Sequence, residues 1–223
     1  MLANFSVERS LMKAKSHAKK GELAEAQKLY ETILQNFSNN IRAQQGLASL
    51  VKNKQDNVIQ SPPQEAVNQL VNLYNQGQFA VVAEQAEALT KQFPKDCIVW
   101  NLLGAANIGL GQFEKATDAL KKVTELNPNY AIGFNNLGIA FKDQGKLDEA
   151  VEIFKKALLI NPHSHETYNN MGNALQDKGK SDEAIEAYKT AITLKPDYAQ
   201  AYYNLGTTYK DLGRLEEAIE VYK

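Results

Sequence analysis

Few residues in this sequence have the types and spacing that catalysis or metal binding requires. The histidines are His17, His163 and His165, and the only cysteine is Cys97. His163 and His165 are separated by one serine and could hold a metal ion only with ligands from elsewhere, so we interpret them as part of a surface turn. Cys97 opens a predicted helix and has no histidine beside it, which indicates an inert, half-buried thiol.

Sequence motifs of enzymes are missing as well. The sequence has no glycine-rich phosphate loop, no H-E-x-x-H and no G-x-S-x-G. Its carboxylates are spread over predicted helix surfaces rather than gathered in one place. We therefore predict that the chain is not an enzyme and that it holds neither a cofactor nor a metal ion.

Asparagine is the polar residue that recurs at fixed intervals. Two series with a spacing of 34 residues run through the chain: Asn101, Asn135 and Asn169, and Asn136, Asn170 and Asn204. Asparagine is only a middling helix former, so its recurrence on predicted helices calls for a reason. Its amide carries both donors and an acceptor, and a row of amides can bind the backbone of an extended peptide without demanding a particular sequence. The plainer interpretation is that asparagine merely tolerates a hydrated surface.

The same spacing governs the elements that must position these side chains. A period of this size is typical of a solenoid repeat. Within each period the apolar residues recur three and four apart, which predicts two amphipathic helices. The sequence divides into four complete units and one partial unit: 63–96, 97–130, 131–164, 165–198 and 199–223.

Glycine, proline and small residues recur at fixed places in each unit. A glycine follows the first helix, where a left-handed backbone can turn the chain, and a proline ends the second helix. Glycine and alanine inside the helices predict close helix packing, and large residues, among them Trp100 and Phe154, predict the core around them. The recurring residues are Gly77, Gly111, Gly145, Gly179 and Gly213 in the turn, Pro94, Pro128, Pro162 and Pro196 at the end, and Gly138 and Ala150 as examples of the small positions.

This pattern resembles the tetratricopeptide repeat (TPR): an aromatic residue, then Leu-Gly, an aromatic residue, Ala, an aromatic residue and Pro. The match is specific over 97–223, good over 63–96 and weak over 7–53. The wording NNLGIAFKDQGKLDEA further resembles the superhelical TPR arm of O-linked N-acetylglucosamine transferases and related bacterial TPR proteins. The resemblance implies an all-α, right-handed superhelical solenoid of antiparallel helix-turn-helix hairpins, whose first helices line a concave groove.

The resemblance also implies which side chains face that groove. The candidates for partner binding are Asn68, Asn101, Asn135, Asn136, Asn169, Asn170, Asn173, Tyr203 and Asn204, with the charged residues Lys142, Asp143, Asp177, Lys210 and Asp211. The charged residues could select basic or hydroxyl-bearing side chains, or could simply end a hydrated helix. The unit at 97–130 places Ile98 and Leu102 there and so predicts an apolar patch. Chaperone-binding TPR domains resemble each other in a lysine-rich carboxylate clamp, and Asn101 or Asn135 stands where its first lysine would be.

We predict two parts joined by a linker. Residues 1–53 form a degenerate TPR hairpin plus one extra helix, residues 54–62 form a polar linker that ends in Pro62-Pro63, and residues 63–223 form the TPR array. Ser61 and Gln64 have the spacing of a capping box at the start of the next helix.

Charge bears on the class of partner. The net charge is −1, which gives no general attraction to nucleic acid, but residues 1–53 carry eight Lys/Arg against four Asp/Glu. No apolar run is long enough to insert in a membrane, and no secretory signal begins the chain, so we expect a cytoplasmic location.

The sequence stops before a closing proline, and we expect Leu205, Tyr209, Ile219 and Tyr222 to be partly uncovered. Self-association through that end, or through the basic N-terminal part, would follow.

Two functions fit this sequence. The first is a scaffold for protein–protein interaction that binds a partner protein or extended peptide in an asparagine-lined groove. The alternative is the substrate-recruiting arm of a larger glycosyl-, sulfo- or methyltransferase whose catalytic domain lies beyond residue 223.

Overall fold

The structure is a computed structural model that describes residues 2–58 and 61–223, with side chains described over 7–50 and 61–223. The described residues form thirteen helices and no strand, which confirms the predicted all-α helical-repeat fold. The chain divides into two compact units, unit 1 (Met1–Ser61) and unit 2 (Pro62–Lys223).

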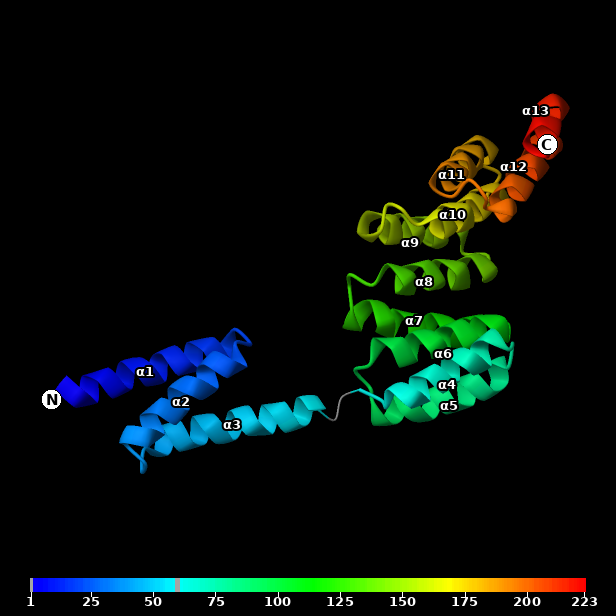
Figure 1. The fold of residues 1–223 in the computed structure, drawn as a ribbon. Helices are drawn as coiled ribbons and strands as arrows, with labels where there is room; N and C mark the ends of the chain where they lie inside the picture. Colours follow the sequence, from blue (N-terminus) through cyan, green and yellow to red (C-terminus); the bar gives the residue numbers. More distant parts are fainter. Residues whose placement is uncertain (1, 59–60) are drawn as a thin grey trace. The chain divides into compact units, whose positions relative to one another are not determined.

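Helices alternate with short turns throughout both units (Figure 1). Unit 1 contains α1 (Leu2–Lys19), α2 (Leu23–Asn36) and α3 (Ile41–Val58). Unit 2 contains α4 (Gln64–Asn75), α5 (Phe79–Gln92), α6 (Cys97–Gly109), α7 (Phe113–Leu126), α8 (Ala131–Asp143), α9 (Leu147–Ile160), α10 (His165–Asp177), α11 (Ser181–Leu194), α12 (Ala199–Asp211) and α13 (Leu215–Val221). In unit 2 each hairpin stacks on the one before it, and the even-numbered helices are the first helices of the hairpins.

The predicted turn glycines close the first helices. Gly145 has a φ of 75°, in the left-handed region that side chains avoid. The N–H of Lys146 then donates to the carbonyl of Phe141 at 2.9 Å, and the N–H of Gly145 donates to Lys142 at 2.8 Å. These are the hydrogen bonds of a Schellman motif, which satisfies the last carbonyls of a helix while the chain reverses.

Close approach of the two helices in a hairpin explains the glycine inside α8. A Cβ atom added at Gly138 would lie 2.5 Å from a ring carbon of Phe154 on α9. Phe154 is fully buried, as is Tyr188 at the equivalent place on α11. Glycine therefore removes bulk where an aromatic ring of the partner helix lies close to the backbone, and this packing offsets the roughly 1 kcal/mol that glycine costs in a helix.

Each unit has a hydrophobic core of its own. In unit 1, Leu11, Tyr30 and Leu50 from α1, α2 and α3 are buried together. In unit 2 the buried residues form successive clusters between neighbouring hairpins, and Trp100 packs against two of them. The interpretation of the large residues as core is confirmed for Phe154, whereas Trp100 is only partly buried and packs at the edge of the core.

The boundary between the units differs from the sequence prediction. We expected a linker from residue 54, but α3 continues to Val58. No glycine or proline occurs between Gly46 and Pro62, so nothing in the sequence ends the helix earlier. The residue that caps α4 is Pro63, which makes no side-chain capping hydrogen bond, rather than Ser61 as the predicted capping box requires.

The last hairpin covers more apolar surface than we expected. Leu205 and Tyr209 are only 3% and 4% exposed, so the prediction that they are uncovered is wrong, whereas Ile219 and Tyr222 are more than half exposed. Arg214 lies 4.6 Å from the centre of the Tyr209 ring and shields it.

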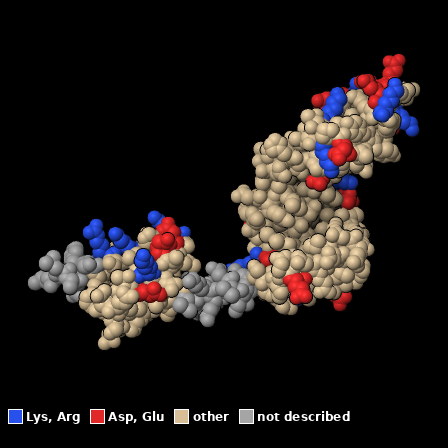
Figure 2. All heavy atoms as spheres, viewed as in Figure 1, with Lys and Arg blue, Asp and Glu red and all other residues tan. Residues whose placement is uncertain are grey.

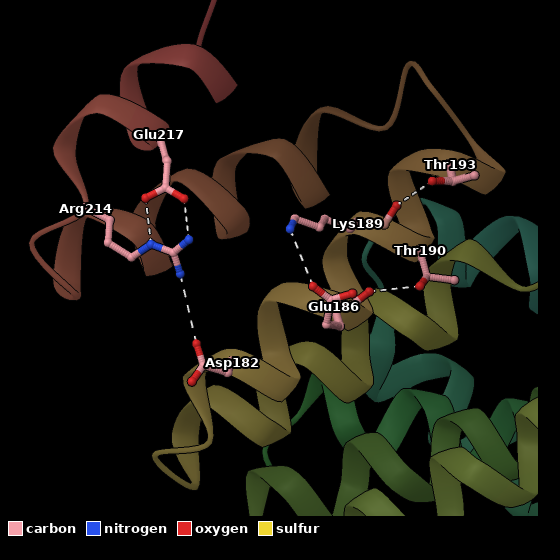
Figure 3. A network of polar contacts seen from close by, with 7 residues as sticks. All are labelled: Asp182, Glu186, Lys189, Thr190, Thr193, Arg214 and Glu217. Carbon is pink, nitrogen blue, oxygen red and sulfur yellow. Dashed lines mark hydrogen bonds and ion pairs between the residues drawn. The ribbon is translucent and has the colours of Figure 1, made fainter.

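A polar network ties this end of the array together (Figure 3). Arg214 Nε donates to Glu217 at 2.6 Å, and a second nitrogen of the guanidinium lies 4.0 Å from Asp182 on α11. The hydrogen bond from Arg214 lowers the pKa of the Glu217 carboxyl. Because these groups are exposed to solvent, the network orients the last turn more than it stabilises the fold.

Charge is distributed differently over the two units. In Figure 2, Lys and Arg side chains gather over α1 of unit 1, whereas charges of both signs lie over the last helices of unit 2. Within the described residues, no helix combines the length and the apolar character that crossing a membrane requires.

Candidate functional site

The recurring asparagines meet one another across neighbouring hairpins. Three hydrogen bonds of the same kind join α6 to α8, α8 to α10 and α10 to α12. In each, the Nδ2 group of the later helix donates to Oδ1 of the earlier one: Asn136 to Asn101 at 3.0 Å, Asn170 to Asn135 at 3.1 Å, and Asn204 to Asn169 at 2.9 Å. We call these six residues the asparagine ladder.

The ladder is connected to the core at its C-terminal end. Asn204 also donates to Oδ1 of Asn173 at 2.9 Å, and the hydroxyl group of Tyr188 lies 2.8 Å from the same oxygen as a donor. Burial raises the pKa of the Tyr188 hydroxyl, and the nearby carboxylate of Asp177 raises it further. The hydroxyl therefore stays protonated and available as a donor to the ladder.

Mutual hydrogen bonding changes the expected role of several asparagines. Asn101 and Asn169 are only 9% and 3% exposed, so they can offer little surface to a ligand. Their oxygen atoms serve as acceptors for the next hairpin. Burial between the first helices gives these two side chains a structural role, and their direct contact with a partner stays a prediction.

Other members of the ladder keep accessible polar groups. Asn135, Asn136, Asn170 and Asn204 are half-buried, as is Asn173 beside the ladder. An amide has two N–H donors and a carbonyl oxygen, and one ladder bond uses only one of the two donors of each later asparagine. Asn170 donates to Asn135, and its own oxygen can still act as an acceptor. The ladder can therefore hold the hairpins together and still present amide groups outward.

Asn68 lies outside the ladder. It is exposed on α4, and its Oδ1 accepts a hydrogen bond from Gln64 one turn earlier at 3.0 Å. Its counterpart in the next unit is Leu102, which is 9% exposed and packs in the core. Leu102 therefore interrupts the row of asparagines. Because Leu102 is buried, the apolar patch predicted for this unit consists mainly of Ile98, which is 46% exposed.

The predicted charged residues lie at the ends of the first helices. Lys142 and Asp143 form an ion pair at 2.7 Å. The other candidates, which are exposed, are Asp177, Lys210 and Asp211. Tyr203, which takes the place of an asparagine on α12, is 62% exposed.

Sequence reasoning missed the polar side chains that tie hairpins together beside the ladder. Gln144 Nε2 donates to the carbonyl of Phe113 at 2.9 Å and to Thr117 Oγ1 at 2.6 Å, across the hairpin boundary. Gln176 accepts from Thr208 at 3.0 Å. These glutamines do not recur at one place in the units, so periodicity gives no signal for them.

The histidines do not form a metal site. His165 packs edge-on against the ring of Tyr198, with 4.8 Å between ring centres, and His163 is exposed. Over the described part of the chain, no group of three or more His, Cys, Asp and Glu side chains could hold a metal ion.

Comparisons with known proteins agree with this architecture. Family models described as TPR repeat match residues 104–145 and 172–213, and models described as tetratricopeptide repeat match 131–164 and 153–186. No curated protein matches the sequence.

Solved structures give the same assignment of fold. MamA is 25% identical, with a TM-score of 0.60, over 68% of this chain and 88% of its own. TTC0263, a TPR protein of Thermus thermophilus, is 18% identical, with a TM-score of 0.57, over 91% of this chain and 98% of its own. YrrB, described as a TPR protein with an unusual peptide-binding site, is 20% identical, with a TM-score of 0.54, over 87% of this chain and 89% of its own. With its repeated hairpins, turn glycines and close-packed helix pairs, the chain contains tetratricopeptide repeats, which the family models match within residues 104–213.

Proposed function

We propose that this chain is a non-catalytic scaffold that binds an extended segment of a partner protein along the first helices of unit 2. The observation that carries the proposal is the outward side of the asparagine ladder. Half-buried amides recur there once per hairpin, next to exposed Tyr203 and Asp177. TPR solenoids use such continuous surfaces for binding, and YrrB is described as having a peptide-binding site.

The chemistry of the surface favours backbone recognition over a demanding sequence motif. Amides can donate to peptide carbonyls and accept from peptide N–H groups. Because each ladder asparagine already has a partner in the fold, its position is fixed before the ligand arrives. A preorganised donor loses less entropy on binding than a free side chain does. The charged residues at the helix ends would then select among peptides.

The test should avoid the ladder itself, because its variants also weaken hairpin packing. Peptides that bind the full chain are first selected from a random library. Their affinities for the wild-type chain and for the variants Tyr203→Ala and Asp177→Ala are then compared. We expect each substitution to weaken binding about fivefold, which corresponds to roughly 1 kcal/mol. Leu159→Ala is the matched control, because Leu159 is 85% exposed on a second helix, α9.

The proposal fails if the selected peptides bind both variants as tightly as the wild-type chain. Peptides that instead lose affinity for variants of the second-helix face would place the binding site there.

A further inference from the structure

A cavity of unit 2 lies away from the asparagine ladder. It has a volume of about 640 Å³ and opens between the second helices α5 and α7, with α6 as its floor. Trp100, Leu103 and Asn107 form that floor. We call this cavity the outer groove. None of the ladder residues lines it.

The side chain at one position of the repeat explains why the outer groove is open. The floor residue Asn107 corresponds to Phe141, Leu175 and Tyr209 in the following units. Phe141 occupies its own groove, with the ammonium groups of Lys121 and Lys146 within 6.0 Å of the ring centre. Above Leu175 the corresponding cavity measures about 340 Å³. The groove is therefore widest where the side chain is neither aromatic nor aliphatic.

Asn107 is a buried polar group at the bottom of a largely apolar space. Its side chain is 3% exposed, and Nδ2 donates to the carbonyl of Leu103 at 2.9 Å. The amide retains a second N–H and a carbonyl oxygen. A polar group of this kind on an apolar floor fixes the orientation of what enters, as in other binding sites of this size.

The two walls of the outer groove repeat at helical spacing. On α5 the wall residues are Ala80, Ala83, Glu84 and Glu87, and on α7 they are Lys115, Asp118, Ala119 and Lys122. Both rows follow the i, i+3, i+4, i+7 pattern of one helix face, over roughly 10 Å of helix length. Alanine in each row widens the space, and the charged residues stand along the edges.

The edges carry opposite charge. The α5 edge has two carboxylates, of which Glu87 pairs with Lys91 at 3.1 Å. The α7 edge has two ammonium groups on either side of Asp118, and Lys122 pairs with Glu125 at 2.7 Å. The walls thus have a net charge of −2 and +1 when Asp118 is included.

We propose that the outer groove binds an amphipathic helix of a partner protein. Its apolar stripe packs on Trp100 and Leu103 between the two walls, and one polar side chain in that stripe bonds to Asn107. Basic residues flank the stripe on the side of Glu84 and Glu87, and acidic residues flank it on the side of Lys115 and Lys122. A helix fits because two rows of side chains at helical spacing accept the ridges of a third helix, and anchors at i, i+3, i+4 and i+7 span the groove. This interaction goes beyond the proposed peptide binding, since it uses the second helices.

Trp100 makes a direct test possible, because it is the only tryptophan in the chain and lines the groove. The probe is a synthetic tryptophan-free helix of about 15 residues, with leucines along one stripe, lysines on one flank and glutamates on the other. A second peptide of the same composition has lysines and glutamates mixed on both flanks, so that neither direction of the helix matches the two edges. Both are titrated into the full chain while Trp100 emission is recorded. We expect the first peptide to bind at least about fivefold more tightly than the second.

Variants of the chain separate the groove from its surroundings. Asn107→Phe fills the space as Phe141 does in the next unit, and we expect it to weaken binding about tenfold or more. Asn107→Leu, with the residue found at 175, should have an intermediate effect. Glu84→Lys with Glu87→Lys should abolish the preference between the two peptides, because both edges of the groove are then positive. The control is Glu114→Lys with Glu149→Lys, which makes the same charge change at exposed residues outside the groove.

Several outcomes would overturn the proposal. Equal affinity for the two peptides would exclude recognition by the charged edges. Unchanged binding to Asn107→Phe, in a variant whose circular dichroism shows native helicity, would exclude the cavity. Equal binding of a proline-interrupted version of the first peptide would exclude a helical ligand.

Discussion

Asn136 donates its hydrogen bond to an oxygen atom that is nearly out of reach of water. Asn101, the acceptor, is 9% exposed. We expect Asn136→Ala to lower the free energy of unfolding by about 1–2 kcal/mol, because the change leaves that oxygen buried without its partner. Urea denaturation followed by Trp100 emission measures it, since Trp100 is next to Asn101 in α6.

A double-mutant cycle shows whether the two amides act as a pair. Asn101→Ala and Asn136→Ala together should cost less than the sum of the single changes, by about 1 kcal/mol. The control is Asn68→Ala, whose exposed side chain bonds only within α4. Strict additivity of Asn101→Ala and Asn136→Ala would contradict a structural role for the ladder.

Tyr188 makes stability depend on pH at the alkaline end. Burial raises the pKa of its hydroxyl, so the folded chain keeps it neutral while the unfolded chain ionises it near pH 10. This contribution to stability is complete below pH 10 and is lost progressively above it. At pH 8 we expect Tyr188→Phe to be about 1 kcal/mol less stable than wild type, since it lacks the hydrogen bond to Asn173.

At pH 11 that difference should disappear or reverse, because ionisation in the unfolded state costs the wild-type chain about 1.4 kcal/mol per pH unit. Urea midpoints of both proteins at pH 8 and pH 11 provide the measurement. A difference that stays constant over this range would mean that the hydroxyl ionises equally in the folded and unfolded states.

At the scale of the hairpin, two glycines with different structural roles allow the cost of a glycine-to-alanine change to be compared. Gly138 faces the ring of Phe154 at close range, whereas a Cβ added at Gly145 meets nothing within 4 Å but sits at a φ of 75°. We expect Gly138→Ala to cost about 1–3 kcal/mol through overpacking, although alanine is the better helix former. Gly145→Ala should cost about 1–2 kcal/mol through backbone strain. Thermal unfolding followed by circular dichroism gives both values.

A second substitution distinguishes the two mechanisms. Phe154→Leu, which reproduces the pairing of Gly104 with Leu120, should relieve part of the cost of Gly138→Ala and none of the cost of Gly145→Ala. If Phe154→Leu lowers stability by the same amount in both backgrounds, the ring is not what excludes a side chain at 138.

Much of the hairpin architecture could be predicted because single residues determine it. Gly145 and Pro162 mark a turn and a helix end by backbone sterics alone, and Gly138 with Phe154 marks a helix contact. The end of α3 could not be predicted from polarity, because polar residues without glycine or proline remain compatible with a helix. Tyr209 is buried because it packs in a cluster with residues of α10 and α11 and lies against Arg214 from the next turn, so the pattern of α12 alone does not show its burial.

The candidate site was predicted less completely for a similar reason. The sequence shows that asparagine recurs every 34 residues, but each ladder hydrogen bond joins residues 35 apart, such as Asn135 and Asn170. The stagger between neighbouring first helices determines that offset, and a single repeat does not encode it. The outer groove is open because Asn107 stands where later units have Phe141, Leu175 and Tyr209. The sequence shows this difference, but only the structure shows that the shared position lines the space between second helices.

At the scale of the whole molecule, unit 2 presents two chemically different faces. The first helices offer fixed amides and suit an extended backbone, whereas the outer groove offers an apolar floor between charged edges and suits a folded helix. The ladder and the outer groove share α6 but different residues of it, Asn101 and Asn107. Occupation of one face therefore leaves the other free, and the scaffold could hold two partners together.

The C-terminal hairpin adds a third surface, through which copies of the chain could associate. Four exposed apolar residues lie around α13: Leu212, Leu215, Ile219 and Tyr222. Exposed apolar residues gathered around one short helix are typical of interaction sites, and a symmetric pair of copies would bury the same residues on each. We expect light scattering to show an average mass that rises with concentration. Leu215→Glu with Ile219→Glu should abolish the rise, because burial of each such side chain contributes about 1.5–3 kcal/mol.

Salt distinguishes this mode from association through charge. An apolar interface at α13 should persist or strengthen as salt is added. Attraction between the basic unit 1 of one copy and the acidic unit 2 of another should weaken once the salt concentration is high enough to bring the screening length below about 10 Å. Leu159→Glu is the control, because Leu159 is 85% exposed but lies on α9, away from the patch. A wild-type chain that stays monomeric at every concentration would exclude both modes. A mass that rises only at low salt would assign association to the charged units and leave the surface of α13 without a role in it.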